Sequence, residues 1–182
     1  MKNHKVKLAL VLGSVRAGRF CDTVARWAAA QIADRGVFAV DVIDPAAPIA
    51  PQALEQRLAD ADAFVVVVPE YNHGYPAPLK QLIDSTNDAW RAKPVGFVSY
   101  GGMSGGIRAV EQLRQVFVEL HAMTIREQVA FAHARDQFGI DGRPLAAERA
   151  ARAMSAMLSR LAWWARALRE ARATAPYEGA LA

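Results

Sequence analysis

The chain has 182 residues, of which 53% are hydrophobic and 22% charged, and these proportions exclude an intrinsically disordered protein. The length suits one domain with a full core. The formal net charge is +4, but many of the arginines lie in residues 143–182 among Ala and Leu, a pattern typical of a solvated helix face. Neither a nucleic-acid-binding motif nor a run of membrane-spanning length is present, so we expect neither partner.

The numbers of cysteines and histidines bear on disulfide bonds and metal sites. The single cysteine, Cys21, excludes a disulfide framework and a cysteine-rich metal site. One cysteine fits a reducing compartment, and we expect a cytoplasmic protein. The four histidines show no metal-ligand spacing, so no metal site is predicted.

The chain alternates between strand-like and helix-like segments. Short aliphatic runs that end at Gly or Pro predict strands, and "AFVVVV" at 63–68 is apolar on both faces, as a central parallel strand must be. Apolar residues at helical spacing predict the helices. The predicted elements are strands at 6–12, 38–44, 63–68, 94–100 and 123–131, and helices at 20–36, 52–61, 78–87, 104–120 and around 154–168.

Five strand–helix pairs predict an α/β fold with one parallel sheet between two helical layers. We expect a flavodoxin-like three-layer sandwich with a five-stranded parallel sheet in the order 2-1-3-4-5. Residues 1–172 would form a single domain, and residues 173–182 a flexible C-terminal tail. Ligands of such folds bind at the carboxyl ends of the central strands, here the first, third and fourth.

The loop after the first strand, "GSVRAGRF", resembles a phosphate-binding loop. Gly13 and Gly18 have the spacing of G-x-x-x-x-G-K-[ST]. However, Arg19 stands where the motif has Lys, and Phe20 stands where it has the metal-binding hydroxyl. A nucleoside triphosphate with Mg²⁺ is therefore disfavoured, and the lack of G-x-G-x-x-G disfavours a dinucleotide.

A terminal monophosphate fits this loop better. Ser14 offers a hydroxyl, Arg16 and Arg19 offer guanidinium groups, and the helix that starts near Phe20 offers free backbone N–H groups. The alternative is that the glycines only turn the chain and that the arginines are solvated.

Two further loops carry unusual residues. "PEYNHGYP" at 69–76 is stiffened by prolines and could bind the edge of a ring, although it could also be a rigid turn with incidental polar residues. In "YGGMSGG" at 100–106, four glycines would let the backbone approach a flat ligand, whereas the alternative is a loose surface turn. His73 could act as a general acid. Cys21 could be a reactive thiol, but we favour a packing role.

These three loops, in this order and after the matching strands, resemble the NADPH-dependent FMN reductase family. By position, the resemblance implies that Ser14 and Arg16 hold the FMN phosphate, helped by the helix start at Arg19, Phe20 and Cys21. The residues it places beside the isoalloxazine and ribityl groups are Pro69, Glu70, Tyr71, Asn72 and His73 on one side and Tyr100, Gly101, Gly102, Ser104 and Gly105 on the other. Many members carry a small hydroxyl residue or Asn where this chain has Phe20 and Cys21.

The resemblance also implies an activity and an assembly. Hydride would pass from NADPH or NADH to bound FMN and then to a small-molecule acceptor: a quinone, azo compound, metal oxyanion or free flavin. No catalytic side chain is needed, because the flavin carries the chemistry. Members tend to form homodimers or homotetramers through the face that bears the ring loops, here Glu70, Tyr71 and Arg108. The alternatives are a flavodoxin-type electron carrier, which the basic charge disfavours, and a non-enzymatic flavin-binding regulator.

Overall fold

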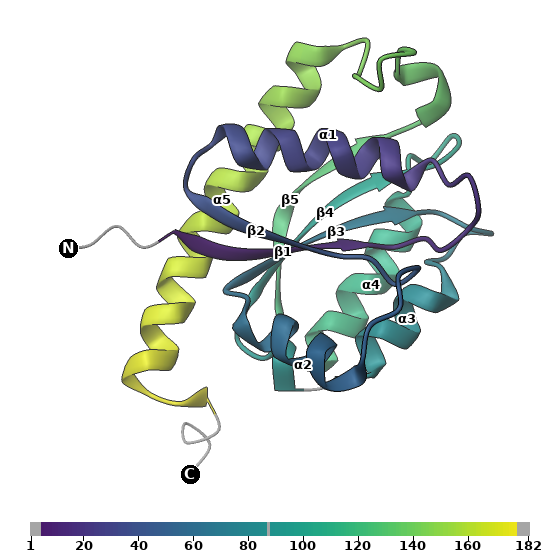
Figure 1. Ribbon diagram of the computed structural model, residues 1–182. Helices are drawn as coiled ribbons and strands as arrows, with labels where there is room; N and C mark the ends of the chain where they lie inside the picture. Colours follow the sequence, from purple (N-terminus) through teal and green to yellow (C-terminus); the bar gives the residue numbers. More distant parts are fainter. Residues whose placement is uncertain (1–4, 87, 178–182) are drawn as a thin grey trace.

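Five parallel strands form the central layer of the computed structural model, which describes residues 5–86 and 88–177 (Figure 1). Their order is β2-β1-β3-β4-β5, as predicted. Each neighbouring pair is parallel, so the carboxyl ends of all the strands lie at one edge of the sheet. The strands are β1 (Val6–Leu12), β2 (Phe38–Ile43), β3 (Ala63–Pro69), β4 (Pro94–Tyr100) and β5 (Met123–Phe131).

Helices cover both faces of the sheet, which gives the predicted three layers (Figure 1). On one face, α1 (Cys21–Asp34) and α5 (Ala147–Thr174) pack in one hydrophobic cluster. On the other face, a second cluster contains side chains from the remaining three helices. These are α2 (Pro51–Asp60), α3 (Ala77–Asp84) and α4 (Ile107–Glu119).

The burial of the strands follows their place in the sheet. Every residue of β3 and β4 is buried, because helices cover both faces of these central strands. In contrast, Val40 and Val42 on the edge strand β2 are 37% and 46% exposed. The apolar character of β3 therefore reflects its central place. The half-exposed β2 lies at the edge of the sheet, where the predicted strand order places it.

Two predicted segments, the helix at 78–87 and the C-terminal tail at 173–182, lie partly outside the described residues. The helix predicted to reach Asn87 ends at Asp84, and position 87 is not described. Helix α5 extends to Thr174, and the Tyr177 hydroxyl lies 2.8 Å from His121 Nδ1. Residues 178–182 of the predicted tail are also outside the described residues, and the division at residue 172 stays a prediction.

The turn between β4 and α4 is shaped by close backbone approach. Gly106 has φ +87°, and a Cβ atom there would lie 2.8 Å from Ser99 Cβ and 2.9 Å from the Tyr100 nitrogen. Ser99 Oγ donates a hydrogen bond of 2.8 Å to the Gly105 carbonyl. The turn therefore folds tightly back on the end of β4, where only glycine fits.

Replacing Gly106 with alanine should destabilise the protein more than the same change at Gly36. Gly36 also has a positive φ, +67°, but its Cβ would meet nothing within 4 Å. Gly36→Ala should lower the free energy of unfolding by about 1 kcal/mol through backbone strain alone. Gly106→Ala should lower it by about 2–4 kcal/mol, because overpacking is added to the strain. Urea unfolding measures both; equal losses would contradict the tight turn.

Candidate functional site

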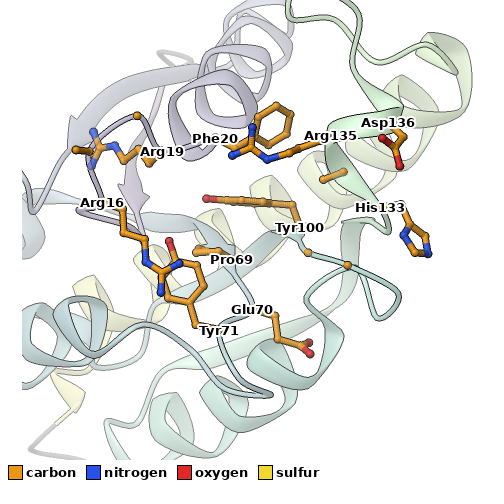
Figure 2. Close-up of a pocket in the computed structure, with 15 residues that line it drawn as sticks. Arg16, Arg19, Phe20, Pro69, Glu70, Tyr71, Tyr100, His133, Arg135 and Asp136 are labelled. Carbon is orange, nitrogen blue, oxygen red and sulfur yellow. The ribbon is translucent and has the colours of Figure 1, made fainter.

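A cavity of about 470 Å³ opens at the carboxyl edge of the sheet (Figure 2). It is lined by the loops that follow β1, β3, β4 and β5, so it lies where the strand order reverses. Its size is within the usual range for small-molecule sites. The lining residues are Arg16, Ala17, Gly18, Arg19, Phe20, Pro69, Glu70, Tyr71, Tyr100, Gly101, Gly102, His133, Ala134, Arg135 and Asp136.

The first loop is attached to the third-strand loop by a partly buried hydrogen bond. Ser14 is fully buried, and its Oγ lies 2.7 Å from the Tyr71 hydroxyl. The same Oγ accepts a long hydrogen bond, 3.4 Å, from the Arg16 backbone nitrogen. The Arg16 guanidinium stacks on Tyr71, with its carbon 3.5 Å from the ring centroid. Tyr71 thus supports both ends of this part of the loop.

Arg19 has its charge matched inside the protein. Its Nη1 donates to Asp44 Oδ1 at 2.8 Å and to the Ser14 carbonyl, and its Nε donates to Asp22 Oδ1 at 2.7 Å. The hydrogen bond to Asp44 raises the pKa of Arg19 above its ordinary value and lowers that of Asp44. The Arg19 side chain is only 9% exposed, and its bonds to Asp44 and to the Ser14 carbonyl stabilise the first loop.

Glu70 connects the third-strand loop to the turn before α4. Its carboxylate accepts hydrogen bonds from Ser104 Oγ at 2.6 Å, from Arg108 Nη1 at 2.9 Å and from the Arg108 backbone nitrogen at 3.2 Å. Burial alone would raise the pKa of Glu70, but these donors outweigh it and hold the pKa below its usual range. A charged carboxylate therefore fixes the glycine-rich turn beside the cavity.

Two aromatic rings, Phe20 at the top of Figure 2 and Tyr100 below it, line the cavity. The Phe20 ring centroid lies 6.0 Å from that of Tyr100 and 5.4 Å from that of Phe138, in edge-to-face contacts. The Arg135 guanidinium carbon lies 5.4 Å from the Phe20 centroid. Burial raises the pKa of the Tyr100 hydroxyl, so it is neutral at physiological pH.

The structure brings the three predicted loops together, and most of the predicted site residues line the cavity. Others lie behind its wall: Ser14 binds Tyr71, Ser104 binds Glu70, and Cys21 is fully buried with its Sγ 3.8 Å from the Val67 carbonyl. Burial raises the pKa of the Cys21 thiol, which agrees with the packing role favoured from the sequence.

Three predicted residues occupy turn positions. Asn72 and His73 are exposed, have φ values of +49° and +68°, and do not line the cavity. Gly105 is buried, and a Cβ atom there would lie 2.9 Å from the Ala132 nitrogen. Whether these residues contact a ligand stays a prediction.

Sequence reasoning missed the segment after β5. His133, Ala134, Arg135 and Asp136 all line the cavity. The His133 nitrogen donates to the Gly102 carbonyl at 2.8 Å, and the Ala134 nitrogen donates to the Gly101 carbonyl at 3.1 Å. No motif marks this segment, but the predicted strand order places the end of the fifth strand at the same edge of the sheet, which was the available signal.

The donor set fits a flat ligand with one anionic end. Phe20, the residue before α1, provides no side-chain cap, so the first-turn N–H groups are not capped by it. In the described ranges 5–86 and 88–177, neither Arg16 nor Arg135 has an acidic partner. Gly102 leaves open space, because a Cβ there would meet nothing within 4 Å. FMN has these features: a planar ring and a terminal monophosphate.

The described residues also bear on whether the chain has a metal site or a membrane-spanning helix. Among the described residues, no group of three or more His, Cys, Asp or Glu side chains is arranged to hold a metal ion. None of the helices in that same part of the chain is long and apolar enough to cross a bilayer.

The two first-loop arginines should differ in their effect on stability. Arg19→Gln should lower the free energy of unfolding by about 1–3 kcal/mol, because the Asp44 carboxylate would lose its charged donor. Arg16→Gln should lower it by at most about 1 kcal/mol, the value of an exposed cation–π contact. Chemical denaturation of both variants tests this. A larger loss for Arg16→Gln would contradict the division of roles.

Comparison with known proteins shows the family of this chain. The family profile described as NADPH-dependent FMN reductase matches residues 6–136. An NAD(P)H-dependent FMN reductase of Schizosaccharomyces pombe is 35% identical over 130 residues, which cover 60% of this chain and 64% of the relative. A quinone reductase of Escherichia coli K12 is 33% identical over 143 residues, which cover 69% of this chain and 76% of that protein. The chain thus spans just under two thirds to about three quarters of these relatives.

Solved structures confirm the predicted flavodoxin-like fold. The flavoenzyme NAD(P)H:acceptor oxidoreductase FerB of Paracoccus denitrificans superposes with a TM-score of 0.73 at 17% identity, over 88% of this chain and 97% of FerB. A flavodoxin from the domain Archaea superposes with a TM-score of 0.57 at 15% identity, over 86% of this chain and 99% of the flavodoxin. With a profile match that covers well over half of its residues, the chain belongs to the NADPH-dependent FMN reductase family, as its three loops predicted.

Proposed function

We propose that this protein is an FMN-dependent NAD(P)H oxidoreductase with a quinone as its acceptor. The observation that carries the proposal is the cavity at the carboxyl ends of β1, β3 and β4, which combines a cationic loop, an aromatic wall and a glycine-rich turn. Bound FMN supplies the chemistry, because it accepts hydride from a reduced nicotinamide and passes electrons to a second substrate. Family membership and the quinone reductase among the relatives support this activity.

The residues of the first loop would bind and orient the phosphate. Arg16 offers a guanidinium without an acidic partner among the described residues, and Tyr71 holds it in place by stacking. The backbone N–H groups at the start of α1 add donors that favour an anion. Arg19 contributes indirectly, because its bond to the Ser14 carbonyl and its pair with Asp44 fix the shape of the loop.

The third- and fourth-strand loops would position the ring. Glu70 binds Ser104 and Arg108, which keeps the glycine-rich turn at a set distance from the third-strand loop. Gly102, with no Cβ, leaves room for a planar group against the backbone. Because the flavin carries the chemistry, the protein needs no side-chain nucleophile, and its contribution is orientation and electrostatics.

The acceptor and assembly follow from the same face. A quinone fits a site whose second substrate must lie flat against an exposed ring, and azo compounds, metal oxyanions and free flavin are the other acceptors to compare. Met103, which is 77% exposed, lies in the segment joining β4 to α4, and Ile107, which is 44% exposed, is the first residue of α4. Their exposure favours a homodimer or homotetramer formed through this face. The single cysteine favours a cytoplasmic protein.

A flavodoxin-type electron carrier is the second candidate, favoured by the structural similarity to the archaeal flavodoxin. The formal net charge of +4 disfavours it, because such carriers usually present an acidic docking face. A non-enzymatic flavin-binding regulator is the third candidate.

Steady-state oxidation of NADPH and NADH with 1,4-benzoquinone tests the proposal, after the visible spectrum and the identity of any released yellow chromophore have been recorded. We expect turnover that depends on both the nicotinamide and the quinone. A protein that binds FMN but hardly turns over would be a carrier or a regulator, and one that binds no flavin would refute all three candidates.

Arg16→Ala should weaken FMN binding far more than riboflavin binding, because the two ligands differ only in the phosphate. A hydrogen bond to a charged group contributes about 1.5–3 kcal/mol, so FMN affinity should fall about ten- to a hundredfold. Flavin fluorescence titration measures both affinities, and a parallel titration of the unaltered protein should show tighter binding of FMN than of FAD. Equal losses for FMN and riboflavin would mean that Arg16 supports the fold or the ring.

Gly102→Val should abolish turnover and leave the protein folded. The added side chain meets no protein atom within 4 Å at its Cβ, but it would intrude on a ring held against this backbone. Circular dichroism and the quinone assay measure the two effects, with Gly102→Ala as the smaller matched change. Normal turnover of the valine variant would show that the ring does not lie against this turn.

A further inference from the structure

We propose that Arg135, held against Phe20, is a second cation for the phosphate of the bound flavin. The inference rests on the proposed function, because it names a further residue of the same cavity. Arg135 follows β5, outside the three loops that carry the family resemblance. Its partner would be the FMN monophosphate, which Arg16 and the backbone N–H groups at the start of α1 would also bind.

The position of the guanidinium carries the first step. In Figure 2, the Arg135 side chain extends from the segment after β5 toward Phe20 and the first loop. Its guanidinium carbon lies 5.4 Å from the Phe20 ring centroid, and both residues line the cavity. Phe20 is itself held by edge-to-face contacts with Tyr100 and Phe138. The Phe20 ring cannot donate a hydrogen bond to phosphate, but it contacts the Arg135 guanidinium, which can.

The charges of the cavity supply the second step. A phosphate monoester carries about −1.5 to −2 at neutral pH. Arg19 does not supply a free charge, since Asp44 and Asp22 already match it. Within residues 5–86 and 88–177, Arg16 and Arg135 are the arginines that line the cavity without an acidic partner. Together the two guanidinium groups would bring two positive charges to this phosphate, whereas Arg16 alone would bring one. Asp136 also lines the cavity, but in Figure 2 the Arg135 side chain extends away from it, toward Phe20.

The backbone around Arg135 supplies the third step, because this segment is tied to the site. The His133 and Ala134 nitrogens donate to the carbonyls of Gly102 and Gly101. The Asp136 nitrogen donates to the His133 carbonyl at 2.9 Å, which closes a short turn around Arg135. The segment is thus built onto the same glycine-rich turn that would face the ring, so Arg135 is placed before any ligand binds.

An anionic group of the nicotinamide substrate is the other phosphate that Arg135 could meet. The direction of the side chain favours the flavin, because the guanidinium reaches toward Phe20 at the start of α1. The experiment separates these two sources of phosphate.

The test titrates protein freed of flavin with FMN and with riboflavin and follows flavin fluorescence. Arg135→Gln should lower FMN affinity about tenfold or more and change riboflavin affinity by less than about twofold. Phe20→Leu should lower FMN affinity by a smaller factor, with its folding checked by thermal unfolding. Arg143→Gln is the matched control: it lies on the same connection, is paired with Asp141 and is 83% exposed, so it should change neither affinity.

Each result decides the proposal. An FMN-specific loss in Arg135→Gln with Arg143→Gln unchanged supports it. Unchanged FMN affinity, or equal losses for FMN and riboflavin, overturns it. The quinone assay of Arg135→Gln supplies the KM for NADPH. A rise in this KM with unchanged FMN affinity also overturns the proposal and assigns Arg135 to the nicotinamide substrate. An unaltered protein that binds neither flavin refutes the proposed function itself, whereas one that prefers FMN while Arg135→Gln behaves identically refutes only this inference.

Discussion

The candidate site depends on two adjacent residues at the end of β3 that bind in different directions. Glu70 accepts hydrogen bonds from Ser104 and Arg108 in the turn before α4, and Tyr71 bonds Ser14 in the loop after β1. A poorly exposed carboxylate is costly unless donors surround it, so Glu70 compels the glycine-rich turn to fold toward it. The central strand thereby sets the separation of the two loops that flank the cavity.

The parallel sheet makes this arrangement possible. Since β3 lies between β1 and β4, residues just beyond its carboxyl end reach both neighbouring loops. The close approach of Gly106 to Ser99 and Tyr100 then restricts the backbone of this turn to one conformation over the end of β4. The cavity results from the strand order, the hydrogen bonds around Glu70 and the close contacts of the glycines. It is already formed in the protein without a ligand.

The strands and helices could be predicted from the sequence because each is determined by a local pattern. The continuous apolar run of β3 and the apolar stripe of α4 indicate which of their residues are buried, and the alternation of strands and helices predicts a parallel sheet. The strand order was predicted from the flavodoxin-like fold. What local patterns do not contain is pairing across long separations. Arg19 and Arg16 look alike in sequence, yet Asp44, 25 residues after Arg19, engages only one of them. The Arg135 segment was missed for the same reason, because its place is set by backbone bonds to Gly101 and Gly102.

Ion pairing of the arginines also means that the formal net charge is a poor guide to the charge of the cavity. The +4 charge of the chain does not describe the cavity, since much of the basic surplus lies on α5, where Arg152 pairs with Glu148 and Arg169 with Asp62. Charge that an internal acid already matches attracts an incoming anion weakly. Glu70 and Asp136 also line the cavity, and Glu70 is paired with Arg108. The unmatched positive charge of the described cavity arginines therefore comes from guanidinium groups held on aromatic rings, which orient a cation without neutralising it. Tyr71 does this for Arg16 and Phe20 for Arg135, so the aromatic residue that replaces a hydroxyl in the first loop becomes a means of placing charge.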